Sequence, residues 1–330
     1  MNLAESILKV KGLKVGFPID IGYSYVVDGV DFEIPTGSVV GLLGESGAGK
    51  SLIAESIMGL TKAPPAKLEG EILFKGRDIL KLKDAELSKI RGKDLGMIMQ
   101  DPTSALNPVF RVGAQVAEPI QLHLNKGKKT AWQMTVDIFK NKVGIPSAEA
   151  RVRYYPHQFS GGMKQRVVIG MGISCSPELL IADEPTCSLD VTIQAQILEL
   201  IQKLVSELGT SALYISNDLG VISQMCKEVF ILYAGKIVEK GDVDLVFNRP
   251  GHPYTKGLIK SVPKIGVSRL EPIPGTISSL GEYPKGCRFQ PRCPVAIEKC
   301  FAPPSPPFFQ VEAETSQAVA CWKFERGFSG

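Results

Sequence analysis

The chain has 330 residues, a length that predicts two domains or one large domain with an appendage. Its composition, 44% hydrophobic and 22% charged residues, is that of a globular protein and excludes a disordered or fibrous chain. A net charge of +4 is too small to indicate nucleic acid or anionic lipid as a partner.

Neither a membrane span nor a secretory signal is expected. No apolar run approaches the roughly 18 residues that cross a bilayer, and lysines interrupt the apolar residues at the start of the chain. We therefore expect a cytoplasmic protein whose seven cysteines are reduced unless something binds them.

The first hundred residues are predicted to be mostly β-structure. Apolar and polar residues alternate over Ile7–Phe17 and again over Val26–Ile34, as in half-buried strands. The apolar run Val39–Leu43 is typical of a strand buried in a parallel sheet. The other elements expected here are a helix over Lys50–Met58 and strands over Glu71–Phe74 and Leu95–Met99.

The character of the chain changes twice after residue 100. Residues 101–161 are predicted to be helical, with helices around Val112–His123 and Thr130–Val143. Then follow a helix (162–173), a strand (179–182), a helix (191–208) and a strand (212–215), an order that indicates a parallel α/β core. From Arg249 onward the chain is rich in proline and is predicted to form an irregular, separate appendage.

A phosphate-binding loop is predicted between the first buried strand and the helix after it. Residues 44–51 (GESGAGKS) fit the pattern GxxxxGK[ST]. Backbone N–H groups and the helix N-terminus would hold phosphate oxygens, with Lys50 at the β and γ phosphates and Ser51 on Mg²⁺. A glycine-rich structural turn is the alternative. The residues expected at the nucleotide are Gly44, Glu45, Ser46, Gly47, Ala48, Gly49, Lys50, Ser51 and Leu52.

Two adjacent carboxylates end the apolar strand at residues 179–182. Asp183 and Glu184 point differently because side chains alternate along a strand. We expect Asp183 to orient the Mg²⁺ shell and Glu184 to polarise an attacking water. Exposed acids at a strand end are the alternative, and the presence of the phosphate loop weighs against it.

The segment FSGGMKQR, Phe159–Arg166, resembles the LSGGQ signature of ABC-type ATPases. Its Phe and Met replace the usual Leu and final Gln, a form similar to that of the peptide-transporter branch. Gln100 matches the Q-loop of that family, the segment Ser188–Asp190 matches the D-loop, and Phe17 stands where an aromatic residue stacks on adenine. The resemblance extends from Ile7 to Gly241.

This resemblance implies a fold, an α/β P-loop NTPase of the ABC cassette type. The cassette would combine a parallel-sheet core, an N-terminal antiparallel β subdomain and a helical subdomain. The expected domains are the nucleotide-binding core in residues 1–100 and 162–248, the helical signature subdomain in 101–161, and a Cys-rich C-terminal extension in 249–330.

Three further segments narrow the resemblance to ATP-binding subunits of dipeptide and oligopeptide importers. They are Tyr155–Gln158 (YPHQ), His252–Thr255 (HPYT) and Cys287–Pro294 (CRFQPRCP). The function implied is an ATPase that powers peptide import. Its partners would be a second ABC ATPase subunit in a heterodimer, two transmembrane permease subunits and, indirectly, an extracytoplasmic peptide-binding protein. The place implied is the cytoplasmic face of the cell membrane.

In this family two cassettes face each other head to tail around ATP. Ser160, Gly161 and Gly162 would grip the γ-phosphate bound to the partner, because they open a helix. Gln158 would touch the ribose bound to the partner, and Asp190 belongs to the D-loop at the nucleotide. Gln100 would join Ser51 on Mg²⁺ and link the ATP cycle to the membrane subunits.

One position departs from the family pattern. Asn217 stands where the family normally has a catalytic histidine. Asparagine can donate a hydrogen bond to a γ-phosphate but cannot become cationic. Slow hydrolysis at this site of a heterodimer and ordinary tolerance of asparagine are both compatible with the substitution.

Four of the seven cysteines are concentrated in the tail: Cys287, Cys293, Cys300 and Cys321. Their spacing matches neither the common zinc pairs nor the ferredoxin runs, but four thiolates around one metal would stabilise a tail with little core of its own. The resemblance suggests a [4Fe–4S] cluster, with zinc as the alternative; free thiols and two disulfides stay open. The three histidines, His123, His157 and His252, are expected at the surface or in loops.

Two alternative functions explain the sequence less well than peptide import. A soluble ABC-type ATPase acting on nucleic acid or ribosomes commonly carries two cassettes on one chain, whereas this chain has one phosphate loop, one signature and no basic stripe. An iron–sulfur redox protein would leave the ATPase motifs unexplained. The sequence therefore predicts a peptide-import ATPase with no nucleic-acid partner.

Overall fold

The structure, a computed structural model, describes residues 5–263, 272–312 and 315–325. The chain divides into two compact units. Unit 1 comprises Met1–Ile7, Ile34–Ser38 and Lys81–Tyr214, and unit 2 comprises Leu8–Glu33, Val39–Leu80 and Ile215–Gly330. The outer limits of the domains expected from the sequence, residues 1 and 330, lie outside the described residues.

The N-terminal segments that alternate in sequence are strands of unit 2, and they form an antiparallel sheet as the family resemblance implies. Its order is β2 (Tyr23–Pro35), β1 (Ser6–Pro18), β4 (Lys67–Phe74) and β5 (Arg77–Asp78). Strand β1 pairs with β4, with Leu8 opposite Phe74. The apolar side chains of β1 face inward and are buried, among them Leu8, Val10 and Val15.

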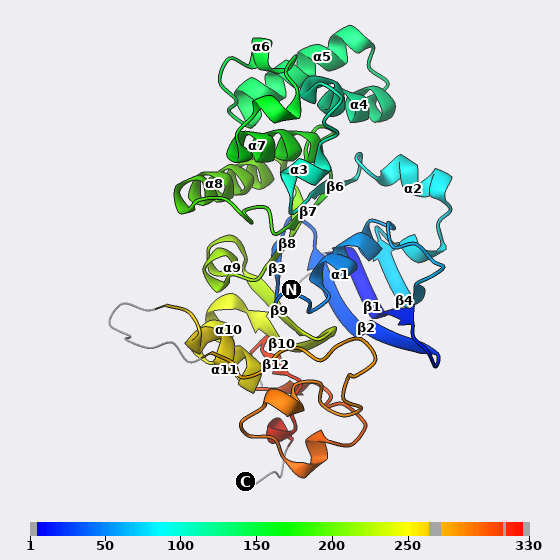
Figure 1. The fold of residues 1–330 in the computed structure, drawn as a ribbon, viewed down its shortest axis with the longest axis vertical. Helices are drawn as coiled ribbons and strands as arrows, with labels where there is room; N and C mark the ends of the chain where they lie inside the picture. Colours follow the sequence, from blue (N-terminus) through cyan, green and yellow to red (C-terminus); the bar gives the residue numbers. More distant parts are fainter. Residues whose placement is uncertain (1–4, 264–271, 313–314, 326–330) are drawn as a thin grey trace. The chain divides into compact units, whose positions relative to one another are not determined.

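The second sheet of unit 2 mixes parallel and antiparallel strands (Figure 1). The predicted buried strand, β3 (Val39–Leu43), pairs in parallel with β9 (Glu228–Tyr233). Strand β9 then pairs antiparallel with β10 (Lys236–Asp242). Helix α1 (Lys50–Ile57) follows β3 in the chain, and helix α9 (Leu219–Met225) precedes β9. The expected parallel pairing is thus confirmed at β3–β9, and the strands beyond β9 run antiparallel.

The C-terminal tail is largely irregular, as expected, but the expectation that it is separate from the core is wrong. Strand β12 (Ala318–Val319) pairs with β10, and β11 (Phe309–Gln310) pairs with β12, so the tail extends the sheet of unit 2. Two helices come before β11 and β12 in the chain, α10 (Val243–Asn248) and α11 (Pro253–Lys260). Strands of two residues are too short to show a period in the sequence. Proline at the first position of α11 opens that helix instead of breaking it.

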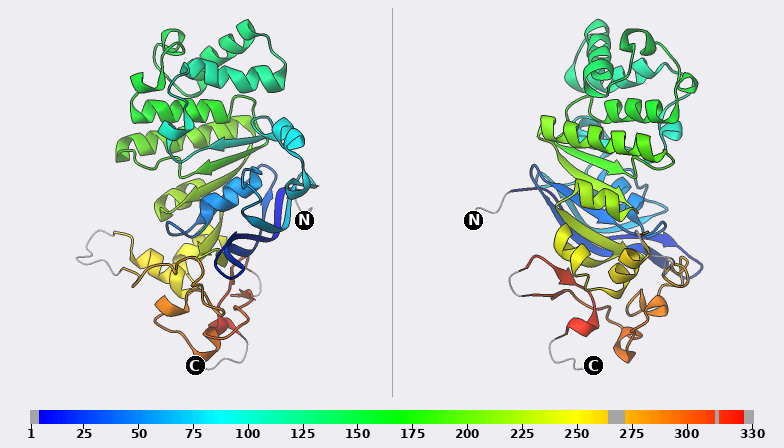
Figure 2. Two further views of the ribbon diagram at one scale, coloured as in Figure 1. Left: turned by 45° about the vertical axis from the view of Figure 1, so that its right-hand side comes forward. Right: turned by 90° about the vertical axis from the view of Figure 1, so that its left-hand side faces the viewer.

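Unit 1 carries a further parallel pair and most of the described helices. Strand β6 (Leu95–Ile98) pairs in parallel with β7 (Leu179–Asp183). Helices α7 (Gly161–Gly172) and α8 (Val191–Leu208) lie side by side (Figure 2). The remaining helices are α2 (Asp84–Ile90), α3 (Pro102–Ala105), α4 (Val112–Leu124), α5 (Lys128–Asp137), continued by a π-helical turn over Ile138–Lys142, and α6 (Ala148–Arg151).

Strand β8 (Ser211–Ser216) passes from unit 1 into unit 2. In unit 1 the Ala212 N–H donates to the Ser38 carbonyl at 2.8 Å, and in unit 2 the Ser216 carbonyl accepts from the Gly44 N–H at 3.4 Å. Short 3-10 turns cover Ile79–Lys81, Pro156–Gln158, Gln290–Arg292, Glu298–Cys300 and Trp322–Phe324. Among the described residues, no helix has the length and apolar character needed to cross a membrane.

One of the three histidines is not where the sequence predicts it. His157 is exposed and stacks on Tyr155, and His123 is half-buried. His252, expected at the surface or in a loop, is only 1% exposed. Its Nδ1 caps α11 by accepting a hydrogen bond from the Tyr254 N–H at 3.1 Å, and burial lowers its pKa to about 3. A lone histidine before a proline carries no sequence signal of burial, so only packing reveals this role.

Burial of neutral His252 should make the protein sensitive to acid. The unfolded chain protonates a histidine near pH 6.5 and the folded protein only near pH 3, so the unfolded state binds more protons in between. The free energy of unfolding should therefore fall as the pH falls through this window. The variant His252→Asn keeps a capping acceptor but does not titrate.

The free energy of unfolding, measured in urea at pH 7 and pH 5, should drop less for His252→Asn than for the wild type. The difference is expected to be about 1 kcal/mol or more. His157→Asn, a change at an exposed histidine, serves as the control and should show the wild-type drop. Equal drops for His252→Asn and the wild type would contradict the burial argument.

Candidate functional site

The predicted phosphate loop lies between β3 and α1 in unit 2, as its sequence context indicates. A Cβ atom on Gly44 would lie 2.3 Å from the Leu232 carbonyl of β9, so the loop packs where only glycine fits. Gly49 has a φ of 102°, which side chains rarely tolerate, and it directly precedes α1. The glycines of the motif therefore meet a backbone requirement of this loop.

Lys50 folds back over the phosphate loop. It is 4% exposed, and its Nζ donates to the carbonyls of Gly44 (2.9 Å) and Glu45 (3.1 Å). Among the described residues no side chain caps the N-terminus of α1, where Lys50 and Ser51 stand. The backbone N–H groups of a first helical turn have no partner within the helix and attract an anion. The loop thus combines helix N–H groups with a cation.

Glu45, the second residue of the loop, is held by the C-terminal extension. Its N–H donates to the Tyr254 hydroxyl at 3.0 Å, and its Oε2 lies 2.9 Å from Nη1 of Arg292. Burial works against the charge of Arg292, but the hydrogen bonds with Glu45 and Tyr233 outweigh it and raise the pKa of Arg292. Sequence reasoning missed both partners, because no motif links positions more than 200 residues apart.

Gln100 and the predicted catalytic acid lie together in unit 1. Asp183 ends β7 and is 4% exposed, and Glu184 follows it with a φ of 43°, unusual for a residue other than glycine. Nε2 of Gln100, two residues after the end of β6, donates to Oε2 of Glu184 at 3.0 Å. Because β6 and β7 are parallel neighbours, their carboxyl ends bring the two side chains to one edge.

The signature residues stand at the start of α7. Ser160 precedes the helix without capping it through its side chain, and Gly161 and Gly162 are its first residues. A Cβ atom on Gly162 would lie 2.7 Å from Cγ2 of Ile193, so α7 approaches α8 closely there. Asp190 caps α8 by accepting a hydrogen bond from the Ile193 N–H at 3.0 Å. Ile193 therefore joins the signature to the D-loop residue.

The other predicted residues are placed as follows. The Gln158 side chain accepts a hydrogen bond from the Tyr155 N–H at 2.8 Å, so it is engaged within its own turn. Phe17 is half-buried on β1. Asn217 is exposed directly after Ser216, whose carbonyl accepts from the Gly44 N–H. Unit 2 thus holds the phosphate loop, Phe17 and Asn217, and unit 1 holds Gln100, Asp183, Glu184 and the signature.

The four tail cysteines share one region of unit 2. The Cys287 N–H donates to the Cys300 carbonyl at 2.9 Å. Burial and the nearby Cys300, Cys293 and Cys321 thiols raise the pKa of Cys287 to about 12. All four are free thiols. In the part of the chain that the structure describes, no group of three or more His, Cys, Asp or Glu side chains is arranged to hold a metal.

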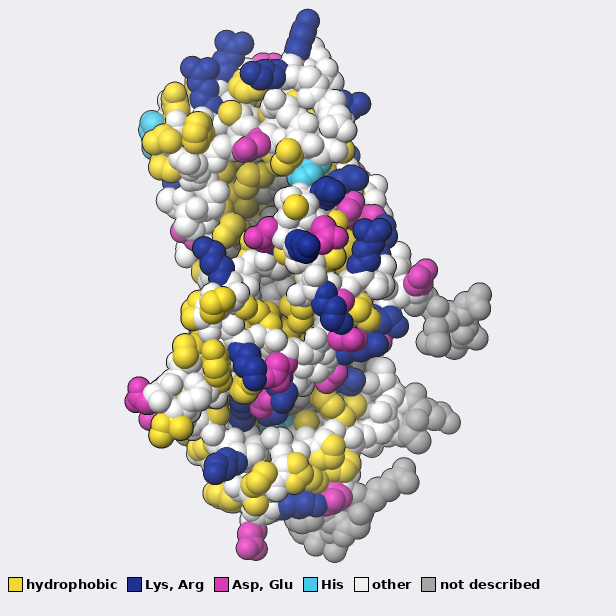
Figure 3. Space-filling view, turned by 90° about the vertical axis from the view of Figure 1, so that its right-hand side faces the viewer, with side chains coloured by type: hydrophobic (Ala, Val, Ile, Leu, Met, Phe, Trp, Pro, Cys, Tyr) yellow, Lys and Arg dark blue, Asp and Glu magenta, His cyan; other side chains and the backbone are white. Residues whose placement is uncertain are grey.

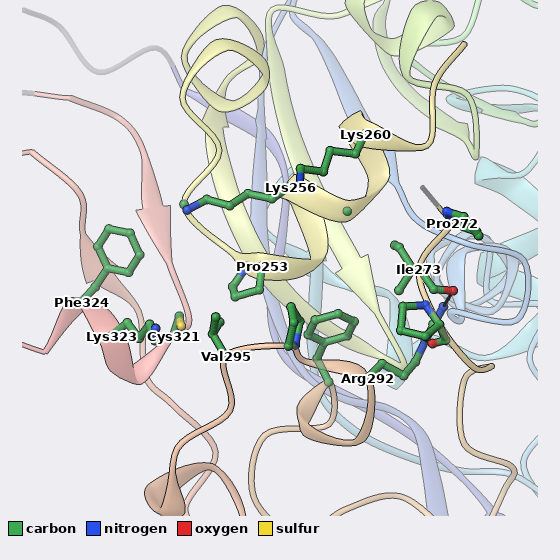
Figure 4. Close-up of a pocket in the computed structure, with 15 residues that line it drawn as sticks. Pro253, Lys256, Lys260, Pro272, Ile273, Arg292, Val295, Cys321, Lys323 and Phe324 are labelled. Atoms are coloured by element: carbon green, nitrogen blue, oxygen red, sulfur yellow. Dashed lines mark hydrogen bonds between the residues drawn. The ribbon is translucent and has the colours of Figure 1, made fainter. Parts of the chain in front are cut away.

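A cavity of about 480 Å³, which the sequence did not predict, is lined in part by Cys321 (Figure 4). Its wall includes Pro253, Lys256 and Lys260 of α11, with Ile273 and Arg292 from the following segments. The described part of the lining is mostly apolar and contains no acidic side chain. Arg292 therefore borders both the phosphate loop, through Glu45, and this cavity.

Two family comparisons agree with this arrangement. Residues 27–187 match the ABC transporter family, and residues 238–300 match the C-terminal region of oligopeptide/dipeptide transporters. The first match contains the phosphate loop, the signature and the acidic strand. The second contains α11, Tyr254 and Arg292, the part that holds Glu45.

Curated relatives and solved structures are similar over most of the chain. A probable peptide ABC transporter ATP-binding protein of Sinorhizobium fredii is 43% identical over 97% of this chain and 96% of its own. The oligopeptide transport ATP-binding protein OppD of Bacillus subtilis is 45% identical over 92% and 86%. A dimeric ATP-binding cassette in a post-hydrolysis state, bound to ADP and Pi, matches with a TM-score of 0.64 and 25% identity, over 72% of this chain and 98% of its own.

Proposed function

Since this chain belongs to the ABC transporter family and is the ATP-binding subunit of a peptide importer, we propose that it binds Mg-ATP at Gly44–Ser51. ATP hydrolysis by the cassette drives transport. The observation that carries the proposal is the uncapped N-terminus of α1 beside the buried cation of Lys50. Backbone N–H groups and a lysine are what a triphosphate requires of its site.

We assign the chemistry to five side chains. Lys50 exchanges its bonds to the Gly44 and Glu45 carbonyls for bonds to the β and γ phosphates. Ser51 and Gln100 would ligate Mg²⁺, which neutralises phosphate charge, and Asp183 orients its water shell. Glu184 acts as the general base toward the attacking water, and its hydrogen bond with Gln100 supports this role because it holds the carboxylate in one orientation.

Replacing Lys50 by alanine should abolish hydrolysis without unfolding the protein. The change removes the side-chain cation of the loop, and we expect ATP hydrolysis to fall by about 100-fold or more. Phosphate release measured with the assembled transporter tests this, with a melting curve of the subunit as the control for folding. Wild-type hydrolysis by Lys50→Ala would show that the site is elsewhere.

The signature works on the ATP of a second cassette. Ser160, Gly161 and Gly162 present the N-terminus of α7, which no described side chain caps, to the γ-phosphate held by the partner. Gln158 reaches the ribose after releasing the Tyr155 N–H, Asp190 contributes from the D-loop, and Phe17 stacks on adenine. ATP then joins two subunits because each supplies half of its contacts, and hydrolysis lets them separate.

The variant Glu184→Gln should bind ATP but not turn it over, because an amide cannot act as a base. Hydrolysis should fall about 100-fold or more, and the variant should accumulate as a dimer when Mg-ATP is present. Size-exclusion chromatography with multi-angle light scattering measures the dimer, with ADP as the control. A monomer at saturating Mg-ATP, even with the second ATPase subunit added, counts against the two-cassette arrangement.

We further propose the partners that the family implies. A second ABC ATPase subunit completes a heterodimer, two transmembrane permease subunits carry the peptide, and an extracytoplasmic peptide-binding protein delivers it. The subunit works at the cytoplasmic face of the cell membrane. The relatives are described as peptide and oligopeptide transport proteins, and these descriptions support this assignment. Acidic and basic side chains are interspersed on the face seen in Figure 3.

We also propose that Asn217 contacts the nucleotide. Asn217 directly follows Ser216, whose carbonyl accepts a hydrogen bond from the Gly44 N–H of the phosphate loop. In the proposed site the Asn217 amide donates a hydrogen bond to the γ-phosphate.

The proposed domains follow the sequence limits. The nucleotide-binding core comprises residues 1–100 and 162–248, the helical signature subdomain 101–161, and the peptide-permease extension 249–330.

We also propose a [4Fe–4S] cluster on Cys287, Cys293, Cys300 and Cys321, with zinc as the alternative. The support is the chemistry of the donors: four thiols share one region, and each thiolate there would be repelled by the others, a cost that a metal centre removes. The sulfur atoms are not arranged as a ligand set among the described residues, so binding would draw them together.

Protein purified without oxygen should be brown and should contain about four iron and four acid-labile sulfide per chain. Cys300→Ser should remove the colour and make the extension more sensitive to protease, because one ligand is lost. Cys175→Ser, a change at a cysteine outside the tail, should keep the colour. Colourless protein that contains one zinc per chain would show that the metal is zinc and not an iron–sulfur cluster. Four thiols that react freely in the native protein would exclude both metal sites.

A further inference from the structure

We infer that Tyr254 and Arg292 of the C-terminal extension position the phosphate loop and set its affinity for ATP. Both act through Glu45, so both are positioning residues. The inference rests on the proposed function, because it takes Gly44–Ser51 as the ATP site. Its new content is that a segment outside the cassette completes this site.

The two contacts with Glu45 fix different parts of the residue. The Tyr254 hydroxyl accepts the Glu45 N–H at 3.0 Å, which sets the orientation of the first peptide of the loop. Arg292 Nη1 binds the Glu45 carboxylate at 2.9 Å, which holds the side chain. Tyr254 is fully buried and the Arg292 side chain is 6% exposed. The Glu45 side chain is 28% exposed, so its ion pair is shielded from water mainly on the Arg292 side, and such shielding strengthens the contact.

Each positioning residue is itself held by several contacts. The Tyr254 ring packs against Tyr233 of β9, with centroids 4.7 Å apart, and against Phe289, with centroids 5.5 Å apart. Arg292 Nε donates to the Pro274 carbonyl at 2.8 Å, and its guanidinium lies over the Tyr233 ring. Burial raises the pKa of Tyr254, so its hydroxyl stays neutral and continues to accept the hydrogen bond.

The charge of Arg292 has a direct consequence for phosphate binding. Glu45 places a carboxylate within a loop that must hold a triphosphate, and like charges repel. Arg292 pairs with this carboxylate at 2.9 Å and so compensates its charge. Without Arg292 the uncompensated charge of Glu45 would weaken ATP binding. The extension thus removes a repulsion that the loop's own sequence creates.

The test is a charge-compensation series in the full-length chain: Arg292→Gln, Glu45→Gln and the double variant. The dissociation constant of Mg-ATP is measured by competition with a fluorescent ATP analogue. Arg292→Gln should weaken binding about fivefold or more, and the double variant should return to within about twofold of the wild type. The KM for ATP in the assembled transporter should follow the dissociation constant while kcat changes little.

A purely structural role of Arg292 would give no rescue by Glu45→Gln, so a double variant as weak as Arg292→Gln overturns the inference. Wild-type affinity in Arg292→Gln also overturns it. Tyr254→Phe, which removes only the hydroxyl, gives a second reading and should weaken binding in a protein that keeps the aromatic packing.

The matched control is Lys299→Gln, which also removes a positive charge from the extension. Lys299 pairs with Glu325 at 2.6 Å, without a contact with Glu45 among those the structure describes. Its loss should leave ATP affinity unchanged. Lys50→Ala tests the ATP site separately from the positioning role. If Lys50→Ala binds ATP with wild-type affinity, the proposed ATP site is wrong. The affinities of the Arg292 and Glu45 variants test the positioning role.

Discussion

The close packing of the phosphate loop on β9 is the constraint on which the rest of the nucleotide site depends. Gly44 meets the Leu232 carbonyl where no side chain fits, and the Gly235 N–H after β9 donates to the Ala48 carbonyl at 2.8 Å. A loop anchored in this way keeps its N–H groups directed at one place. Anion binding gains from such preorganisation because little order has to be created when the ligand arrives.

The side chains proposed to act on ATP are divided between two compact units, and hydrogen bonds hold them in each unit. Unit 2 places the Lys50 cation against carbonyls, and unit 1 places Glu184 against the Gln100 amide. Neither the buried Lys50 ammonium nor the partly exposed Glu184 carboxylate depends on a bound nucleotide for its hydrogen bonds. The phosphate, when it arrives, replaces these contacts, so the free subunit carries no unpaired Lys50 ammonium or Glu184 carboxylate that would unfold it.

The C-terminal extension belongs to unit 2 because β12 pairs with β10 and because its buried polar side chains are bonded to that sheet. Glu239 of β10 accepts from the N–H groups of Gly251 and His252, and His252 in turn caps α11. These contacts hold the start of α11, and with it Tyr254, whose hydroxyl accepts a hydrogen bond from the Glu45 N–H. An extension tied to the sheet in this way moves with the phosphate loop, which is what a positioning role requires.

The sequence by itself determined the phosphate loop, the strands and helices on either side of it, the acidic strand end and the signature, because each is a local pattern of spacing and polarity. The alternation of apolar and polar residues also predicted the N-terminal strands, and the family resemblance implied that they are antiparallel. Only the tertiary structure decided that His252 is buried, that the tail joins the sheet, and that Arg292 neutralises Glu45. Those contacts join residues far apart in the chain, and no local period or propensity encodes a partner at such a distance.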